Sequence, residues 1–181
     1  MGEIVAQAAP VLPVTLAELK AYLRIATSEE DALLAALVRS AADTCEAFLG
    51  RLLIQREVEE VLAPPRAWTR LGAAPVSAIL AVSALGDDGS ATPLPASSYA
   101  IDVDAASEGW VRLLTPIAAG RVRVRYVAGL ATDANGLGEA IRHGLIRLAA
   151  HLYLSRDSTP GAAPPAAVTA LWRPWRRLRL R

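Results

Sequence analysis

The 181-residue sequence predicts a mostly α-helical protein with a β-rich insert, an α+β fold that ends in an extended carboxyl-terminal tail. Apolar residues recur at three- and four-residue spacing near both ends of the chain, whereas short β-rich segments occupy residues 52–128. The last sixteen residues are rich in Arg and Trp. Hydrophobic residues make up 53% of the chain, so one core of ordinary size is expected.

The first helix is predicted at residues 16–24. Residues 1–14 contain two prolines and no periodicity, which indicates an extended arm, and they lack the pattern of a cleaved secretion signal. Thr15 and Glu18 then form the sequence pattern of a capping box, in which each side chain binds the other residue's backbone amide.

A longer helix is predicted at residues 29–49. Ser28 and Asp31 repeat the capping pattern, and Gly50 supplies a left-handed stop. Cys45, the only cysteine, falls on the apolar face and is expected to be a buried small hydrophobe. The apolar positions are Leu33, Leu34, Leu37, Val38, Ala41, Cys45, Phe48 and Leu49.

The middle of the chain predicts short strands separated by Pro, Gly and Asp turns. In the last of them, Val122, Val124 and Tyr126 alternate with arginines, which is typical of a strand with one buried and one solvated face. Gly86 to Gly89 predicts a hairpin turn. The predicted strands cover residues 56–62, 67–71, 76–85, 99–103, 110–114 and 121–127.

A third long helix is predicted at residues 139–155, after a polar, Gly-containing stretch. Residues 15–156 are therefore expected to form a single domain, with residues 157–165 as a proline-rich linker. Residues 166–181 form the closing segment, which is expected to be helical in part and interrupted at Pro174.

Candidate catalytic and metal-binding residues are few. His143 and His151 lie eight residues apart on one predicted helix, about 12 Å along its axis, which is too far for one metal ion. Asp102 and Asp104 could form a carboxylate pair on a strand, but solvated residues at a strand end are the favoured interpretation.

Nucleotide and nucleophile motifs are incomplete as well. Gly136 and Gly138 lack the remaining spacing of a dinucleotide-binding loop, and the serines have no nucleophile-elbow motif around them. We therefore expect no enzyme activity, no cofactor and no metal.

Two groups of arginines are candidates for binding. Arg121, Arg123 and Arg125 alternate along one strand, where a solvated strand face is favoured over a basic stripe for phosphates or an acidic partner. The second group lies in the tail: five of the 19 basic residues are in the last ten residues, which leaves 14 basic against 18 acidic residues elsewhere.

The tail combines these arginines with an apolar stripe at helical spacing: Val168, Leu171, Trp172, Trp175 and Leu178. Trp and Arg dominate protein-binding hot spots, so docking onto a protein partner is favoured. The alternatives are a nucleic-acid arm, a membrane-surface helix and a tail folded back on its own domain. A membrane helix is the weakest of them, because the stretch is short and broken by proline.

Five stretches together resemble the head-tail connector, or adaptor, family of long-tailed phages and phage-like gene transfer agents. Their order and spacing carry the resemblance, which spans about four-fifths of the chain. The stretches are Pro13 to Ile25, Glu29 to Val38 together with Ala41, Ala42 and Leu49 to Arg51, Val122 to Gly129, Ile141 to Tyr153 and Val168 to Leu178.

The resemblance implies a structural role. It implies a helical body that forms a ring, of twelve subunits, under the portal in the neck of a particle assembled in the bacterial cytoplasm. DNA would pass through the ring without specific recognition, stopper or tail proteins would join its other side, and no membrane would be involved. A DNA-binding or packaging-regulatory phage protein is the alternative function.

The resemblance also implies that the closing segment contacts the portal protein. The residues assigned to that contact are Leu171, Trp172, Arg173, Pro174, Trp175, Arg176, Arg177, Leu178 and Arg179.

Overall fold

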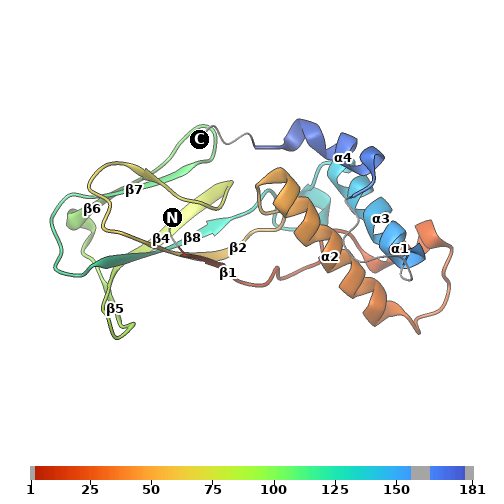
Figure 1. The fold of residues 1–181 in the computed structure, drawn as a ribbon, viewed down its shortest axis with the longest axis horizontal. Helices are drawn as coiled ribbons and strands as arrows, with labels where there is room; N and C mark the ends of the chain where they lie inside the picture. The colour runs from red at the N-terminus through yellow and green to blue at the C-terminus, as the bar shows by residue number, and fades with distance from the viewer. Residues whose placement is uncertain (1–2, 156–163, 178–181) are drawn as a thin grey trace. The chain divides into compact units, whose positions relative to one another are not determined.

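The computed structural model describes residues 3–155 and 164–177 (Figure 1). These residues form four α-helices and eight β-strands, at 35% helix and 28% strand. The expectation of a mostly α-helical protein is therefore wrong, and the fold is α+β with two antiparallel sheets. The sequence prediction missed two strands, Glu3–Ala6 and Ala91–Pro93, because they are short and every residue in them is exposed, so neither shows alternating burial.

The chain divides into two compact units, each built from two separate segments. The β unit comprises Met1–Ala9 and Gln55–Leu130, and the helical unit comprises Pro10–Ile54 and Ala131–Arg181. The chain thus starts in the β unit, builds two helices of the helical unit, returns to complete the β unit and ends in the helical unit.

The β unit contains a five-stranded and a three-stranded sheet, and every strand pair is antiparallel. The larger sheet has the order β1-β2-β8-β4-β5, with β1 (Glu3–Ala6), β2 (Arg56–Leu62), β4 (Val76–Leu85), β5 (Ala91–Pro93) and β8 (Arg121–Ala128). The smaller sheet has the order β3-β7-β6, with β3 (Thr69–Arg70), β6 (Tyr99–Val103) and β7 (Gly109–Leu113).

Strand β8 carries the core of the larger sheet. Val122, Val124 and Tyr126 are fully buried, which confirms the predicted alternation. The Tyr126 hydroxyl donates to the carboxylate of buried Glu60 (2.9 Å) and accepts from the Ala73 amide (3.1 Å). Burial and the neighbouring Glu60 carboxylate raise the pKa of Tyr126, so this hydroxyl stays protonated.

The predicted turn at Gly86 to Gly89 is confirmed, and it joins β4 to β5. Gly89 has a φ of 82°, in the left-handed region that favours glycine. The Asp88 carboxylate accepts from the amide and the hydroxyl of Ser90, and these bonds lower its pKa.

The helical unit contains α1 (Leu16–Leu23), α2 (Asp31–Leu49), α3 (Glu139–Leu154) and α4 (Ala166–Trp172), with the short 3₁₀ helices η2 (Ala134–Gly136) and η3 (Arg173–Trp175). Helix α3 packs against the other three helices. Leu34, Val38 and Leu145 are fully buried between them. Within the described residues, no helix combines the length and the apolar character needed to cross a membrane.

The predicted helix ends are confirmed at two of three places. Thr15 and Glu18 form a complete capping box, and Gly50 ends α2 with a φ of 65°. The second predicted capping box is wrong, because α2 starts after Glu30 with no side-chain cap bond. The acids there bind other elements instead: Glu30 accepts from the Tyr153 hydroxyl of α3 (2.5 Å). Asp31 likewise pairs with Lys20 of α1 (2.8 Å).

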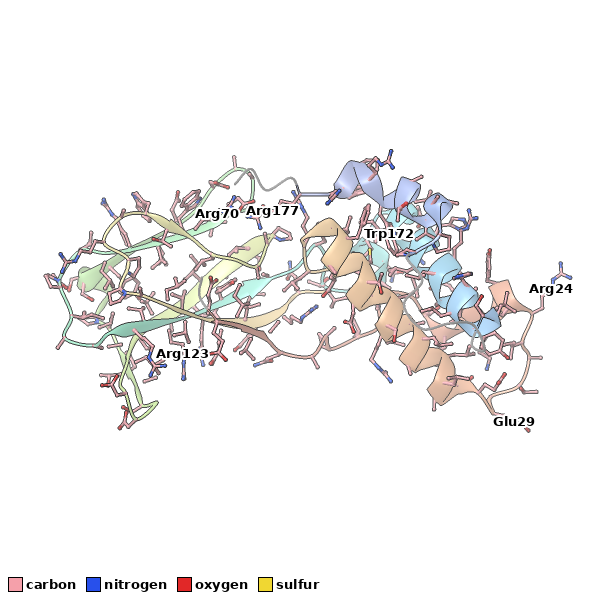
Figure 2. The ribbon with its side chains drawn as sticks, in the orientation of Figure 1. Arg24, Glu29, Arg70, Arg123, Trp172 and Arg177 are labelled. Carbon is pink, nitrogen blue, oxygen red and sulfur yellow. The ribbon has the colours of Figure 1, made fainter. Side chains whose placement is uncertain are left out.

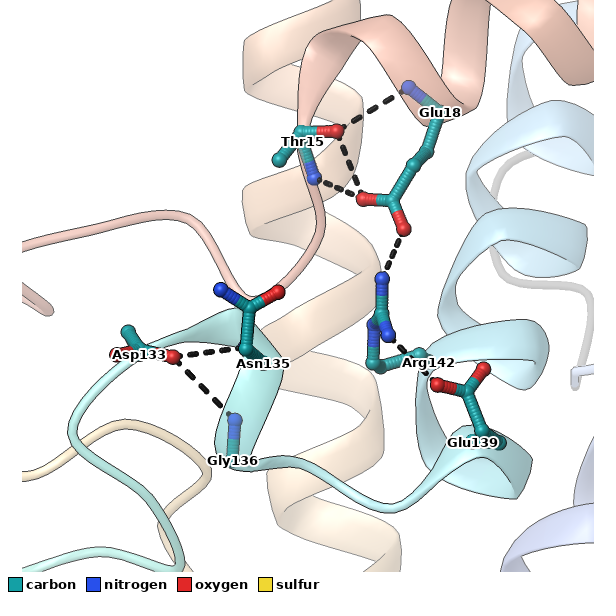
Figure 3. A network of polar contacts seen from close by, with 7 residues as sticks. All are labelled: Thr15, Glu18, Asp133, Asn135, Gly136, Glu139 and Arg142. Carbon is teal, nitrogen blue, oxygen red and sulfur yellow. Dashed lines mark hydrogen bonds and ion pairs between the residues drawn. The ribbon is translucent and has the colours of Figure 1, made fainter.

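The capping box of α1 also connects α1 to α3 (Figure 3). One Glu18 oxygen accepts from the amide (2.8 Å) and hydroxyl (2.7 Å) of Thr15, and the other pairs with Arg142. Arg142 also pairs with Glu139 (2.7 Å), in the first turn of its own helix. The bonds from Thr15, and then Arg142, hold the pKa of Glu18 below its ordinary value of 4.5.

We expect this connection to make the helical unit acid-sensitive. Because the pKa of Glu18 is lowered on folding, its contribution to stability is present above 4.5 and is lost as the pH falls through the folded-state pKa. Chemical denaturation followed by circular dichroism should therefore show that wild type has a higher free energy of unfolding than Glu18→Gln at neutral pH. This difference should shrink as the pH falls below 4.5.

The exposed Glu29→Gln provides the control, since it should show no such change. A gap between wild type and Glu18→Gln that stays constant across the acid range would contradict the assignment.

Candidate docking surfaces

Residues 166–177 of the closing segment are folded onto the helical unit through Trp172. Its side chain is fully buried, and its indole N–H donates to the Ile141 carbonyl (3.3 Å). The ring lies directly on Gly144, where an added Cβ would come 2.2 Å from the indole nitrogen. Phe48 of α2 borders the same space, with ring centroids 6.0 Å apart. Trp172 is thus a core residue that joins α2, α3 and α4 (Figure 2).

The residues that follow η3 contact α2. The Arg177 amide donates to the Leu49 carbonyl (2.8 Å) at the end of α2. The Arg176 guanidinium lies 5.3 Å from the centroid of the Phe48 ring, within range of a cation–π contact. Backbone and side-chain contacts therefore fix the segment at both ends of η3.

The residues assigned to portal contact consequently fall into three groups. Trp172 is buried, while Leu171 and Arg177 are half-buried. The exposed group, which we call the tail surface, comprises Arg173, Pro174, Trp175 and Arg176. Leu178 and Arg179 lie outside the described residues.

Trp175 shows how the predicted apolar stripe is divided. Val168 and Trp172, four residues apart, both face the core. The α-helix then ends and a 3₁₀ turn containing Pro174 follows, so Trp175 no longer continues the buried face. It remains 43% exposed and rests one side of its ring near Gly138.

The arginine face of β8 is partly neutralised. Arg121 and Arg125 are exposed and Arg123 is half-buried, all opposite to the buried face of the strand. The Arg123 Nε lies 3.6 Å from a Glu59 carboxylate oxygen of β2, and Glu59 is also the register partner of Arg125. Arg121 donates to the Gly86 carbonyl (3.3 Å). This face therefore mixes both charge signs.

The remaining polar candidates have structural surroundings. His143 and His151 are exposed on α3, and Asp102 is exposed on β6. The Asp104 carboxylate accepts from the amides of Ala106 and Glu108 (2.9 Å each) and from the indole of Trp110 (3.0 Å), which fixes the β6–β7 loop.

Cys45 is buried as expected, and burial raises the pKa of its thiol. Among residues 3–155 and 164–177, no group of His, Cys, Asp or Glu is arranged to hold a metal ion.

We expect the two tail tryptophans to respond differently to substitution. Trp172→Ala removes a buried side chain and should lower the free energy of unfolding by about 3–5 kcal/mol. Trp175→Ala, at a partly exposed site, should cost about 1 kcal/mol or less. Urea denaturation followed by helical circular dichroism measures both, and equal losses for the two variants would contradict the assigned burial.

Residues 13–82 match the model of the phage gp6-like head-tail connector protein family. No curated protein matches the chain. The matched stretch covers α1, α2, β2, β3 and most of β4, and it includes the first two predicted helices on which the resemblance rests.

Solved structures match the chain over nearly its whole length. A chain in the neck of an empty gene transfer agent (GTA) particle, computed with C6 symmetry, is 27% identical with a TM-score of 0.80, covering 100% of this chain and 97% of that one. A chain in the virion of a native GTA particle is 27% identical with a TM-score of 0.77, covering 98% and 97%. A chain in the neck of a native GTA particle, computed with C12 symmetry, is 28% identical with a TM-score of 0.75, covering 100% and 97%.

The matched chains are structural components of particles, and the necks have cyclic symmetry, which supports a ring assembly. The expected resemblance is thereby confirmed: the chain is a structural subunit of the head-tail connector type, from the neck of a phage-like particle.

Proposed function

We propose that twelve copies of the chain form a ring beneath the portal, joining capsid to tail. The full-length likeness to neck chains carries this proposal. A twelve-membered ring is compatible with both neck symmetries, because every second rotation of a twelve-fold axis is a rotation of a six-fold axis. The role requires no catalysis and no cofactor. DNA passes through the ring without specific recognition, and stopper or tail proteins join the side opposite the portal.

The portal contact is made by the tail surface, with Leu178 and Arg179 following it in sequence. Arg173 and Arg176 offer planar guanidinium groups for acidic side chains, and Trp175 offers an exposed aromatic anchor. The buried Trp172 positions these residues rather than contacting the portal. Because the tail surface is already folded, little of its conformational entropy is lost when it binds.

DNA binding or regulation of packaging is the second candidate function. The arginines of β8 and of the tail are the observation that favours it, since arginine contacts phosphate well. The pairing of Arg123 with Glu59 weighs against it, because it reduces the positive charge of the strand face.

The test replaces both exposed tail arginines. We expect Arg173→Glu with Arg176→Glu to keep the fold and to weaken binding to isolated portal rings at least about tenfold, because acidic portal groups would meet like charges. Surface plasmon resonance measures the affinity, and circular dichroism checks folding. Arg39→Glu, exposed on α2, is the matched control and should bind normally.

The same variants separate the two functions. If portal binding is unchanged while affinity for duplex DNA falls with a reduced salt dependence, the tail is a nucleic-acid arm and the portal contact is wrong.

A further inference from the structure

The two sheets have four edge strands, which differ in how well they are protected against further pairing. Strand β3 has two residues, and β5 has three, including Pro93. Such short or proline-containing edges pair poorly with other chains. Strands β1 and β6 have four and five residues and contain neither Lys nor Pro. Of the four edges, these two are open to another strand.

The hydrogen bonds between β6 and β7 show which backbone groups of β6 point away from β7. The Asp104 amide donates to the Glu108 carbonyl (3.1 Å), and the Leu114 amide donates to the Ser98 carbonyl (2.8 Å). Antiparallel pairs alternate between hydrogen-bonded and non-bonded, so the even-numbered residues of β6 bond to β7. The outward N–H and C=O groups therefore belong to Tyr99, Ile101 and Val103.

The side chains of β6 indicate that its edge is incomplete. Ile101 and Val103 lie opposite Val111 and Gly109, which are buried. They share the buried face of the sheet, yet they are 43% and 39% exposed. The apolar layer thus continues to the margin of the sheet and stops there uncovered.

Strand β1 presents a matching edge. The Gln7 amide donates to the Glu57 carbonyl (3.0 Å), next to the pair of Ala6 with Val58. By the same alternation, Val5 bonds to β2, while Ile4 and Ala6 direct their backbone groups outward. Ile4 is 44% exposed, with its Cδ1 against Gly72, so this edge also carries a partly uncovered apolar side chain.

The two open edges lie on different sides of the β unit. Strand β1 is the first strand of the larger sheet, whereas β6 lies against β4, on the other side of β2 and β8. A ring of identical subunits requires two different surfaces on each copy, because each copy meets its two neighbours head to tail. Two different open edges on opposite sides meet that requirement.

We infer that β1 of one copy pairs with β6 of the next copy, joining the β units into a continuous ring. The added strand would satisfy the outward backbone groups of both edges and cover Ile4 and Ile101. This inference rests on the ring assembly proposed above. Its partner is a second copy of this chain, and pairing of like edges, β1 with β1 or β6 with β6, would end at dimers.

Cysteine cross-linking tests the pairing in rings assembled on the portal. Ile4→Cys is combined in turn with Tyr99→Cys, Ile101→Cys and Val103→Cys. Each combination tests a different register of β1 against β6, and the registers differ by two residues. After mild oxidation, we expect one combination to give a ladder of covalent multimers on a non-reducing gel. Variants with only one introduced cysteine should give no ladder. The parent chain, whose Cys45 is buried, should give none either.

The outcomes distinguish this inference from the proposed function. If rings are visible by electron microscopy on the portal but every combination gives only monomers, or single-cysteine variants give dimers, the head-to-tail pairing is wrong and the connector role stands. If the parent chain forms no ring on the portal, the proposed ring itself fails.

A charge substitution provides a second measurement that needs no register. Ile101→Lys places a charge on the open edge and should raise the concentration needed for ring assembly at least tenfold, without weakening portal binding by single subunits. Leu80→Lys is the matched control, since Leu80 is 45% exposed on β4 of the same unit. Equal effects of the two substitutions would overturn the inference.

Discussion

The contact of Trp172 with Gly144 determines how the carboxyl-terminal segment is presented. The indole fits only because residue 144 has no Cβ, and its N–H reaches the Ile141 carbonyl within the same helix. Burying this large side chain offsets the conformational entropy that is lost when the segment after the proline-rich stretch becomes ordered. With Trp172 fixed, the next turn of chain places Arg173, Trp175 and Arg176 in solvent. A rigid, exposed Arg and Trp surface is thus a consequence of one core contact.

The β unit depends in a similar way on one polar contact. Glu60 is a buried carboxylate, and such a group is costly unless its hydrogen bonds are satisfied. Here the Gly72 amide (2.8 Å) and the Tyr126 hydroxyl donate to it. These bonds join β2, β8 and the loop before β4, and a shift in the register of β2 against β8 would break them. The contact therefore helps to specify which residues of β2 face the core.

Strong periodicity made α2 and β8 predictable, because each shows its buried face repeatedly along its length. The second capping box failed because Glu30 and Asp31 bind Tyr153 and Lys20, tertiary partners that local sequence does not reveal. Six of the eight strands were predicted, and the two that were missed are exposed edge strands that carry no alternation. Sequence composition identified the tail arginines and tryptophans but not their burial, since a buried anchor and an exposed hot spot have the same composition. Both tryptophans lie on a glycine, Trp172 on Gly144 and Trp175 on Gly138, but only Trp172 is fully buried.

In the proposed assembly, docking onto the portal and closure of the ring use different units of the chain, and this separation has a kinetic consequence. The tail surface lies in the helical unit, whereas the open edges lie in the β unit. Pairing of strands of only four and five residues is a small contact, and small interfaces are typical of weak association. In that proposed assembly, neighbouring subunits are held on a common portal, so the same pairing becomes intramolecular and its effective concentration rises. Open edges of this length therefore favour closure on the portal while limiting premature association and aggregation in solution.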